Sequence, residues 1–355
     1  MIKLVNSFLT EHDKEKVNNF LEDYNNMDPI RELKNKIKQI FQINNCYPVN
    51  SGSSALHIAL MAIGVKKNDE VICTTHTCVA ILNAIKYVGA NVILVDCKYD
   101  VNKMDYNIKL NDIKKKITSK TKALIIPHMF GVACEIEEIK NIGIPIIEDI
   151  TLSVGARFSD SSLIGTKGDI TVSSFHRTKV ISADVGGIIW SNNQKYEKNI
   201  CDILDYDGMY SLQYKQTYNY VMGDINAVLA ASQIDQLEKF ISIRRKNADI
   251  LNMELRDIKY INIPDINKNN IYFRYIIEIN NEMTSEYIVN EGIKKGIQFG
   301  RGVFPALHNV LGLDNSNFVN SERAQKKLLS IPVYPGLSKS DLIYICDTLK
   351  NILRS

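Results

Sequence analysis

The sequence predicts an α/β fold built on a largely parallel sheet. Six apolar runs rich in β-branched residues recur between residues 70 and 190. They are continuous rather than alternating, which is typical of strands that helices cover on both faces. Segments of helical period separate several runs, and a strand–helix–strand order favours parallel pairing. The predicted strands are EVICTT (70–75), NVILVDC (91–97), KALIIPHMF (122–130), IPIIEDI (144–150), DITVSSF (169–175) and GGIIW (186–190).

Segments of helical period predict the covering helices and a second domain. A long helical stretch at 232–258 leads into one apolar strand at 271–280 and then two more helices, an order typical of a smaller α+β domain. We therefore expect a large α/β domain over residues 1–245, with an N-terminal helical segment, and a small α+β domain over residues 246–355. The predicted helices are SALHIALMAIG (54–64), CVAILNAIKYVG (78–89), EIEEIKNIG (135–143), the stretch 232–258, SEYIVNEGIKKG (285–296) and SKSDLIYICDTLKNILR (338–354).

Composition argues against several classes of function. The net charge is +3 and the basic run at 114–122 has no interleaved aromatic residues, so nucleic acid is not an expected partner. The longest apolar stretch, at 55–65, is shorter than the ~20 residues that a membrane span requires. The N-terminal residues lack the apolar core and cleavage site of a secretory signal. We expect a cytoplasmic protein without a membrane partner.

Metal and nucleotide-phosphate motifs are absent from the sequence. The seven cysteines are scattered without a CxxC pair, and the six histidines show no ligand spacing, so no metal site is predicted. Neither a GxGxxG motif nor a Walker phosphate loop occurs, which disfavours nicotinamide and ATP chemistry.

Polar residues follow several predicted strands, at the sheet edge where open α/β sheets bind ligands. In SGSSALHIAL (51–60), Gly52, Ser53 and Ser54 open a helix and offer N–H groups and hydroxyls to an anion such as phosphate. The alternative is a plain serine N-cap. Asp149 directly follows a buried aliphatic run and needs a charged or hydrogen-bonding partner, unless it only caps a loop or forms an internal salt bridge. Glu148 alternates to the other face of the strand and is expected to be structural.

Two further residues extend this set. His76 follows the strand at 70–75 and could lie flat on a planar ligand, or its ring could be satisfied by backbone groups. Lys179 lies just beyond the strand at 169–175. A lysine there is either an ordinary surface residue or a desolvated amine with a lowered pKa, as Schiff base chemistry requires. Pyridoxal phosphate requires an anion-binding site, a ring-stacking residue, a carboxylate for its ring nitrogen and a lysine. The sequence offers a candidate for each of them, in this order.

The same stretches resemble a known family. In their order and content they are similar to nucleotide-sugar aminotransferases of the DegT/StrS type, which are fold-type-I pyridoxal phosphate enzymes. The resemblance runs from about residue 28 to the C-terminus and implies a mainly parallel seven-stranded large domain, a small C-terminal domain and a homodimer with shared active sites. It rests on SGSSALHIAL, TTHTCVAILNAI, IIEDITLSVGA, SSFHRTK, TYNYVMGDINAVLAASQIDQL, FPALH and LLSIPVYPGLSKSDL.

The resemblance also implies residue roles. Lys179 would form the imine with the cofactor and shuttle protons, while Asp149 would pair with the pyridine nitrogen. His76 would take the place of the stacking aromatic. The phosphate would be held by Gly52, Ser53, Ser54 and Ser174, with Asn219 reaching it from the neighbouring subunit. Arg177, Arg301 and His308 lie beside motif segments and are candidates for the substrate wall, although each could equally be an ordinary surface contact.

The chain departs from the family pattern at several positions. Leu152 stands where the family usually has a glutamine that bonds the ring hydroxyl, and it can only pack. Asp184 and Val185 fall in a stretch that commonly reads TTGEGG. Val221 replaces an arginine often found in NYRM. The N-terminus is shorter than usual. These changes leave the Schiff base chemistry in place.

By resemblance, we expect transfer of the amino group of L-glutamate, through pyridoxamine phosphate, to a nucleotide-linked ketosugar. The expected substrate is a dTDP-4-keto-6-deoxyhexose, giving a 4-amino-4,6-dideoxyhexose such as dTDP-4-amino-4,6-dideoxyglucose for polysaccharide biosynthesis. One alternative is a pyridoxal phosphate-dependent dehydratase or lyase acting on a sugar or cyclitol. Family members with histidine in place of the lysine are dehydratases, so Lys179 argues against that outcome. The other is a non-enzymatic, cofactor-binding regulatory protein.

Overall fold

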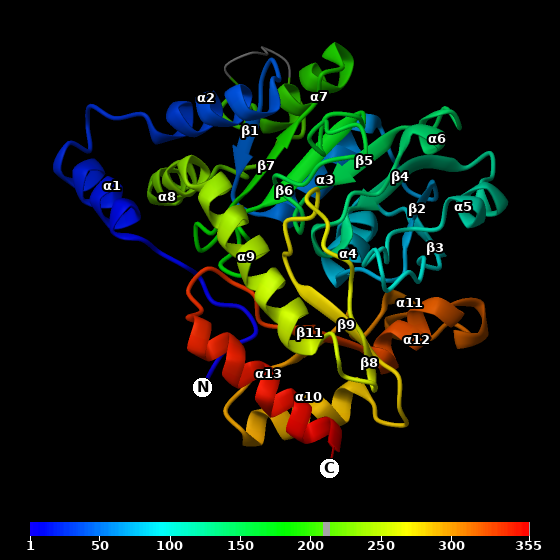
Figure 1. The fold of residues 1–355 in the computed structure, drawn as a ribbon. Coiled ribbons are helices and arrows are strands. Elements are labelled where there is room, and N and C mark those ends of the chain that lie inside the picture. Colours follow the sequence, from blue (N-terminus) through cyan, green and yellow to red (C-terminus); the bar gives the residue numbers. More distant parts are fainter. Residues whose placement is uncertain (209–213, 355) are drawn as a thin grey trace.

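The computed structural model describes residues 1–208 and 214–354 and contains two sheets (Figure 1). The larger sheet has seven strands in the order β1-β7-β6-β5-β4-β2-β3. Strands β3, β2, β4, β5 and β6 pair in parallel, while β7 is antiparallel to β6 and β1 is antiparallel to β7. Its strands are β1 (Tyr47–Val49), β2 (Glu70–Thr74), β3 (Asn91–Val95), β4 (Thr121–Pro127), β5 (Ile146–Asp149), β6 (Ile170–Ser174) and β7 (Gly187–Trp190).

This sheet confirms the predicted α/β class with a mainly parallel sheet of seven strands. All six predicted apolar runs form strands, and β1 is the one that the apolar pattern did not indicate. β1 has only three residues and contains Pro48, which lacks an N–H group and is confined to positions such as this sheet edge.

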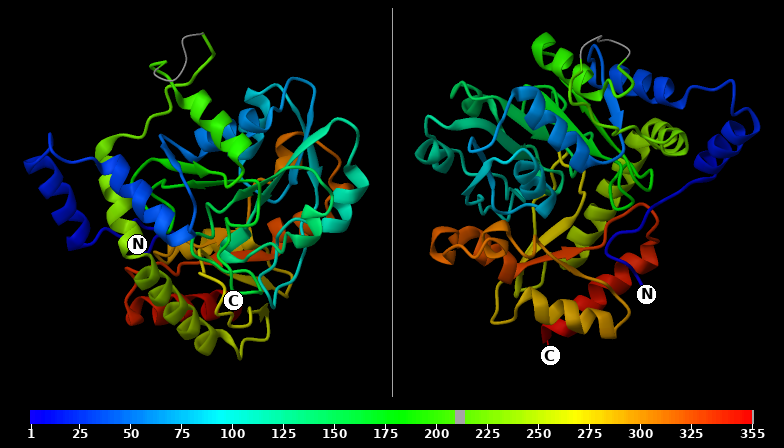
Figure 2. Two further views of the ribbon diagram at one scale, coloured as in Figure 1. Left: turned by 90° about the horizontal axis from the view of Figure 1, so that it is seen from above. Right: turned by 180° about the vertical axis from the view of Figure 1, so that it is seen from behind.

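Helices cover both faces of the large sheet. Helices α3, α4 and α7 pack on one face, and α2, α5, α6 and α8 on the other. Helix α1 lies at the periphery beside α8, as the view from above shows (Figure 2). These helices are α1 (Glu11–Glu22), α2 (Pro29–Phe41), α3 (Gly52–Ile63), α4 (Val79–Tyr87), α5 (Leu110–Lys116), α6 (Glu137–Lys140), α7 (Gln194–Leu204) and α8 (Asp224–Asp235).

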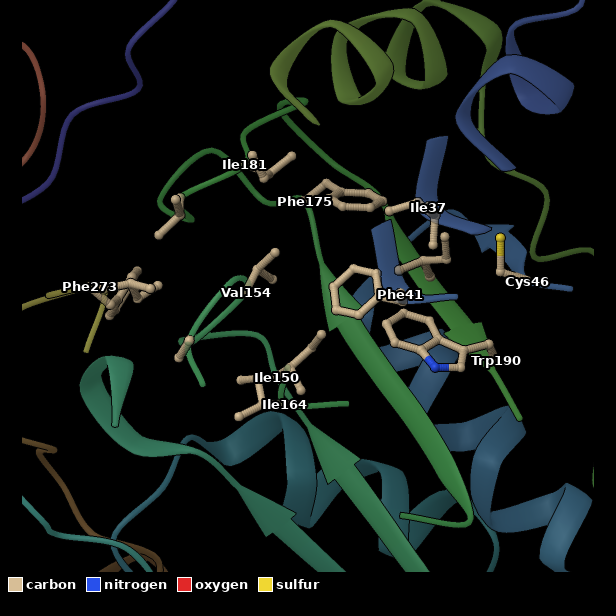
Figure 3. Close-up of a cluster of buried hydrophobic side chains, with 14 of the residues drawn as sticks. Ile37, Phe41, Cys46, Ile150, Val154, Ile164, Phe175, Ile181, Trp190 and Phe273 are labelled. Carbon is tan, nitrogen blue, oxygen red and sulfur yellow. The ribbon is translucent and has the colours of Figure 1, made fainter. Parts of the chain in front are cut away.

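The core on the α2 face is built around aromatic rings. Phe41, in the last turn of α2, lies 4.8 Å from the ring of Trp190 at the end of β7 (Figure 3). The indole nitrogen of Trp190 donates to the carbonyl of Gly165 at 3.0 Å, so its polar atom is satisfied inside the core. Phe175, directly after β6, belongs to the same cluster and fixes the start of the loop that carries Lys179.

The second sheet is antiparallel, with the order β10-β11-β9-β8. Helix α9 joins the two cores, because its first half packs in the large-sheet cluster and its second half in the small-sheet cluster. The strands are β8 (Ile261–Asn262), β9 (Tyr275–Ile279), β10 (Gly300–Arg301) and β11 (Leu328–Ile331). The helices of this part are α9 (Leu237–Leu255), α10 (Ser285–Lys294), α11 (Leu307–Val310), α12 (Val319–Lys327) and α13 (Lys339–Arg354). A short 3-10 turn, η2 (Asn315–Asn317), lies between α11 and α12, and another, η1 (Met129–Gly131), follows β4 of the large sheet.

Two features bear on the expected division at residue 245. That position falls inside α9. The helical stretch expected over 232–258 consists of the end of α8 and the whole of α9, with Gln236 between them. The first residues of the chain also join the second half of the molecule, since the N–H of Ile2 donates to the carbonyl of Gly296 and Gln298 returns a bond to Ile2, both at 2.8 Å. Among the residues that the structure describes, no helix has the length and hydropathy needed to cross a bilayer.

Candidate active site

A cavity of about 550 Å³ lies where the carboxyl ends of the large-sheet strands meet the second half of the chain. Asp149 is the last residue of β5, Cys78 immediately precedes α4, and Lys179 follows β6. Arg274 immediately precedes β9 and supplies a polar group from the other side. Much of the remaining wall is apolar, with contributions from Val79, Met129, Phe130, Leu152, Phe273 and Phe304.

The loop after β6 is closed by its own backbone hydrogen bonds. The N–H of Arg177 donates to the carbonyl of Asp184 at 2.9 Å, and the N–H of Lys179 donates to His176 at 2.8 Å. Asp184 has a φ of 65°, a left-handed conformation that Asp tolerates better than most residues. The side chains of Arg177 and Asp184 also meet at 2.5 Å, although both are exposed and the pair adds little stability. The loop thereby holds Lys179 in the cavity wall.

The surroundings of Lys179 favour its neutral form. Burial lowers the pKa of Lys179, and the Arg274 guanidinium lowers it further, whereas Cys78 and Asp149 oppose the shift. The amino nitrogen lies 5.6 Å from the ring centroid of Phe273. A lysine with a lowered pKa supplies the uncharged amine that attack on a carbonyl requires.

Asp149 is a buried carboxylate with spare hydrogen-bonding capacity. Its Oδ1 accepts the N–H of Thr151 at 2.9 Å. Within residues 1–208 and 214–354, its Oδ2 accepts no hydrogen bond and no Lys, Arg or His lies within ion-pair distance. Because a buried carboxylate without a cationic partner is costly, the cavity is suited to a ligand that presents a protonated nitrogen to this side chain.

Glu148 points to the other face of β5 and is fully bonded. It accepts the N–H groups of Gly165 and Lys167, each at 2.8 Å, the N–H of Gly168, and a hydrogen bond of 3.1 Å from Nε2 of His128. Although burial opposes ionisation, these bonds lower the pKa of Glu148. Glu148 therefore anchors the 165–168 turn, in keeping with the structural role expected for it.

The start of α3 packs tightly against β6 and β7. Ser51 is the N-cap and accepts the N–H of Ser54 at 3.1 Å, while the Ser54 hydroxyl donates to Asn50 at 2.6 Å. A Cβ on Gly52 would lie 2.7 Å from the Cβ of Ser174. The expected phosphate residues Gly52 and Ser174 are thus in contact, and the N–H groups of Gly52 and Ser53 have no acceptor within the helix. These residues do not line the 550 Å³ cavity itself.

The comparisons with known proteins agree with this geometry. The model of the DegT/DnrJ/EryC1/StrS aminotransferase family matches residues 8–350. The chain belongs to this family. The sequence is 30% identical over 364 residues to the GDP-perosamine synthase of Escherichia coli O157:H7, with 96% of this chain and 95% of that protein covered.

Solved structures show the same fold. The PMP form of a Streptococcus pneumoniae protein described as a sugar aminotransferase, Spr1654, superposes with a TM-score of 0.89 and 21% identity, covering 99% of this chain and 98% of that one. A GDP-4-keto-6-deoxymannose-3-dehydratase with a trapped PLP-glutamate geminal diamine has a TM-score of 0.86 and 21% identity, covering 98% of this chain and 100% of that one. Family and fold confirm the predicted sugar aminotransferase class, and pyridoxal phosphate is the cofactor of such enzymes.

The residues present fit this cofactor. A DegT/StrS-family enzyme needs an amine for the aldehyde, an anion for the ring nitrogen and donors for the phosphate. Lys179 and Asp149 line one cavity, and Gly52, at the N-terminus of α3, lies against Ser174. Leu152 lines the cavity and packs there, as expected for an apolar residue that replaces the family's glutamine.

His76 occupies a different place from the one expected. Its ring is fully buried, 5.8 Å from Phe130 and 6.2 Å from Tyr106, and does not line the cavity. Both ring nitrogens lack a hydrogen-bond partner, and burial, together with His308, lowers the pKa of His76 to about 3. Thr77, Cys78 and Val79, the next three residues, line the cavity instead, and burial, with Asp149 next, raises the pKa of Cys78.

The three candidates for the substrate wall also lie outside the cavity. Arg177 is exposed and paired with Asp184. Arg301 donates to the carbonyl of Gln325 at 2.9 and 3.2 Å, and His308 is buried between Thr75 and Glu322. An ion pair therefore engages Arg177, and hydrogen bonds engage Arg301 and His308.

Five polar residues that line the cavity were missed in the sequence, counted among the described residues: Thr77, Cys78, Thr151, Thr178 and Arg274. Cys78 lies two residues after the motif residue His76 and directly before α4. At this position it lines the cavity, whereas His76 does not. Arg274 lies in the apolar run YFRYII, which leads into β9. A single cation interrupts this run, and that interruption is the one sequence signal for Arg274 as a site residue. Asn219 is exposed and does not line the cavity of its own chain.

Proposed function

We propose that the chain transfers the amino group of L-glutamate to the keto carbon of a nucleotide-linked 4-keto-6-deoxyhexose. The observation that carries the proposal is the shared cavity wall of Lys179, with its lowered pKa, and Asp149, a carboxylate without a cationic partner. Amine and carboxylate are the two groups that an electron-sink cofactor needs from the protein.

Pyridoxal phosphate, when bound, supplies the electron sink and carries the amino group between the two half-reactions. Asp149 would keep a proton on the ring nitrogen. Lys179 would accept and return the proton at the carbon that gains or loses the amino group, acting as general base and general acid. Met129, Phe130 and Leu152 would exclude water from this wall.

The phosphate would lie at the start of α3. The free N–H groups of Gly52 and Ser53 and the hydroxyl of Ser174 are the donors that we assign to it. Among the described residues the Ser53 hydroxyl has no hydrogen-bond partner, whereas Ser54 uses its hydroxyl on Asn50 and would contribute less.

The active enzyme is proposed to be a homodimer in which Asn219 reaches the phosphate of the partner's site. Exposed apolar side chains support a subunit interface near Asn219. Val221 is exposed two residues further on, and Ile225 and Val185 are exposed on neighbouring segments that contact each other through Asn226 and the carbonyl of Ala183. Val221 would thus contribute to subunit contact rather than bind a ligand.

The nucleotide of the proposed substrate is thymidine diphosphate or guanosine diphosphate. The dTDP-linked sugar is the one expected from the sequence, whereas the name of the GDP-perosamine synthase relative favours guanosine. A dehydratase shares the fold, yet the lysine at position 179 favours amino transfer.

Measurement of the half-reactions tests the proposal. Purified protein loaded with pyridoxal phosphate should lose its visible absorbance when L-glutamate is added, and the absorbance should return with a nucleotide ketosugar. Products from the dTDP and GDP sugars are then identified by mass. An aminated sugar supports the proposal; release of a deoxy sugar without an amino group, or no spectral response to any amino donor, overturns it. Lys179→Ala should abolish turnover.

A further inference from the structure

One cation in the cavity wall has no role in the chemistry proposed so far. Arg274 lines the cavity together with Lys179 and Asp149. Within the described residues, the guanidinium group of Arg274 makes no hydrogen bond and lies within ion-pair distance of no carboxylate. Its nearest aromatic neighbour is Phe273, whose ring centroid is 5.7 Å from Cζ.

Two other arginines in the same half of the molecule have acceptors for at least part of their guanidinium groups. Arg244 donates to the carbonyls of Tyr272 and Phe273 at 3.2 and 3.3 Å, and Arg323 pairs with Glu278 at 2.5 Å. Arg274 differs, because burial lowers its pKa to about 10 and no acceptor compensates. Arg274 is half-buried in the cavity wall and has no partner of its own among the described residues, which indicates that its counter-ion comes from a ligand.

The position of Arg274 relative to Lys179 restricts what that ligand is. Both side chains lie against the ring of Phe273, with Nζ of Lys179 at 5.6 Å and Cζ of Arg274 at 5.7 Å from its centroid. Because both side chains also line one cavity, an anion held by Arg274 would share that cavity with the reactive amine. In an amino acid, the α-carboxylate is separated from the amino nitrogen by one carbon, whereas the diphosphate of a nucleotide ketosugar is several bonds away from its keto carbon.

We propose that Arg274 binds a carboxylate of the amino donor and selects amino acids over other amines, an inference that rests on the aminotransferase function proposed above. The planar guanidinium would hold the carboxylate through two parallel hydrogen bonds, which fixes the orientation of the donor. Pairing with a carboxylate would also offset the positive charge that disfavours protonation of Lys179. Lys179 would then be better able to accept a proton once the donor is in place.

The test measures the rates of the two half-reactions separately in the variant Arg274→Gln. We expect the L-glutamate concentration for half-maximal rate in the donor half-reaction to rise by about 10- to 100-fold, the range for a lost charge-assisted hydrogen bond. The rate with nucleotide ketosugar should stay within about 3-fold. Arg274→Lys should recover part of the loss, because it keeps the charge but not the planar fork. Arg256→Gln, at an exposed position on the end of α9, is the matched control.

Donor analogues identify the carboxylate. L-glutamine lacks the side-chain carboxylate and isoglutamine lacks the α-carboxylate, so the penalty of Arg274→Gln should vanish for whichever analogue lacks the bound group. Calorimetry with glutarate, which carries both carboxylates and no amine, gives a readout without turnover and should show weaker binding to Arg274→Gln. Melting curves of each variant verify folding.

The outcomes distinguish this inference from the proposed function. An equal penalty with glutamate, glutamine and isoglutamine, or a loss confined to the nucleotide-sugar half-reaction, overturns the carboxylate assignment and points to the diphosphate. Unchanged donor kinetics in Arg274→Gln also overturn it, although the aminotransferase would stand. If the wild-type enzyme does not respond to any amino donor, the proposed function itself fails.

Discussion

Gly52 and Ser174 bring the start of α3 and the end of β6 into contact so close that a Cβ on residue 52 would lie 2.7 Å from the Cβ of Ser174. On the opposite side, a Cβ on Gly187 would lie 2.5 Å from the backbone carbonyl of Ser51. Two glycines therefore let a helix N-terminus reach the sheet edge. Without them, the free N–H groups of α3 would be displaced from the place where we expect the phosphate.

Gly52→Ala should weaken cofactor binding. The added methyl has to displace α3 or β6, which costs about 1–3 kcal/mol of the free energy of unfolding and moves the N–H groups out of position. We expect the dissociation constant for pyridoxal phosphate, measured by equilibrium dialysis, to rise by at least about 10-fold. Ser174→Gly removes the clashing Cβ, so the double variant should regain stability relative to Gly52→Ala. No recovery in the double variant would argue against a steric cause.

Asp149→Asn tests the carboxylate at the end of β5. Asparagine keeps an oxygen for the N–H of Thr151 and should fold normally, but it offers no negative charge to the ring nitrogen. We expect the donor half-reaction to slow by about 10²-fold or more, the scale on which a positioned ionic group contributes to catalysis.

The same substitution should change Lys179. Asp149 raises the pKa of Lys179 against the dominant effect of burial, so its loss should lower that pKa further. In cofactor-free protein, the pH midpoint for chemical modification of Lys179 should therefore move to lower pH. A midpoint that moves upward, or that also moves in the exposed control Asp257→Asn, would show that this electrostatic assignment is wrong.

Glu148→Gln should destabilise the protein without touching the cavity. The NH2 group of glutamine would face either the N–H of Gly165 or the N–H groups of Lys167 and Gly168, so we expect a loss of about 3 kcal/mol in the free energy of unfolding at pH 7. Because the pKa of Glu148 is lowered in the folded state, its contribution is present above its ordinary value of 4.5 and is lost as pH falls through the native value. The difference between variant and wild type should therefore shrink below pH 4.5. Denaturant titrations at pH 7 and pH 4 measure it, and an equal difference at both values would contradict the ionised pairing.

The fold was largely predictable because the signals are local. The apolar runs that form β2 to β7 are continuous, and Asp149 and Lys179 are visible as charged residues at or just beyond the ends of such runs. The short edge strand β1 was missed, since three residues including Pro48 carry no strand pattern.

The site was less predictable because packing between distant segments completes it. Arg274 follows Lys179 by about a quarter of the chain, and nothing local in YFRYII shows that a cavity takes up the guanidinium. The candidates Arg301 and His308 stand beside motif residues, yet their side chains turn to Gln325 and to Glu322. Nearness in sequence to a motif does not fix the direction of a side chain.

His76→Leu distinguishes a core histidine from a ring-stacking one. Burial holds the His76 pKa at about 3, well below its ordinary value of 6.5, so the unfolded chain takes up a proton that the folded protein does not, and stability falls as pH drops below 6.5. The variant lacks this loss and should gain about 2 kcal/mol relative to wild type between pH 8 and pH 5. Because the ring lies outside the cavity, the dissociation constant for pyridoxal phosphate should change by less than about 2-fold. The loss of a stacking contact would cost ~1 kcal/mol and would produce a larger change in that constant. A drop of 10-fold or more in a folded variant would instead restore His76 to the cofactor site.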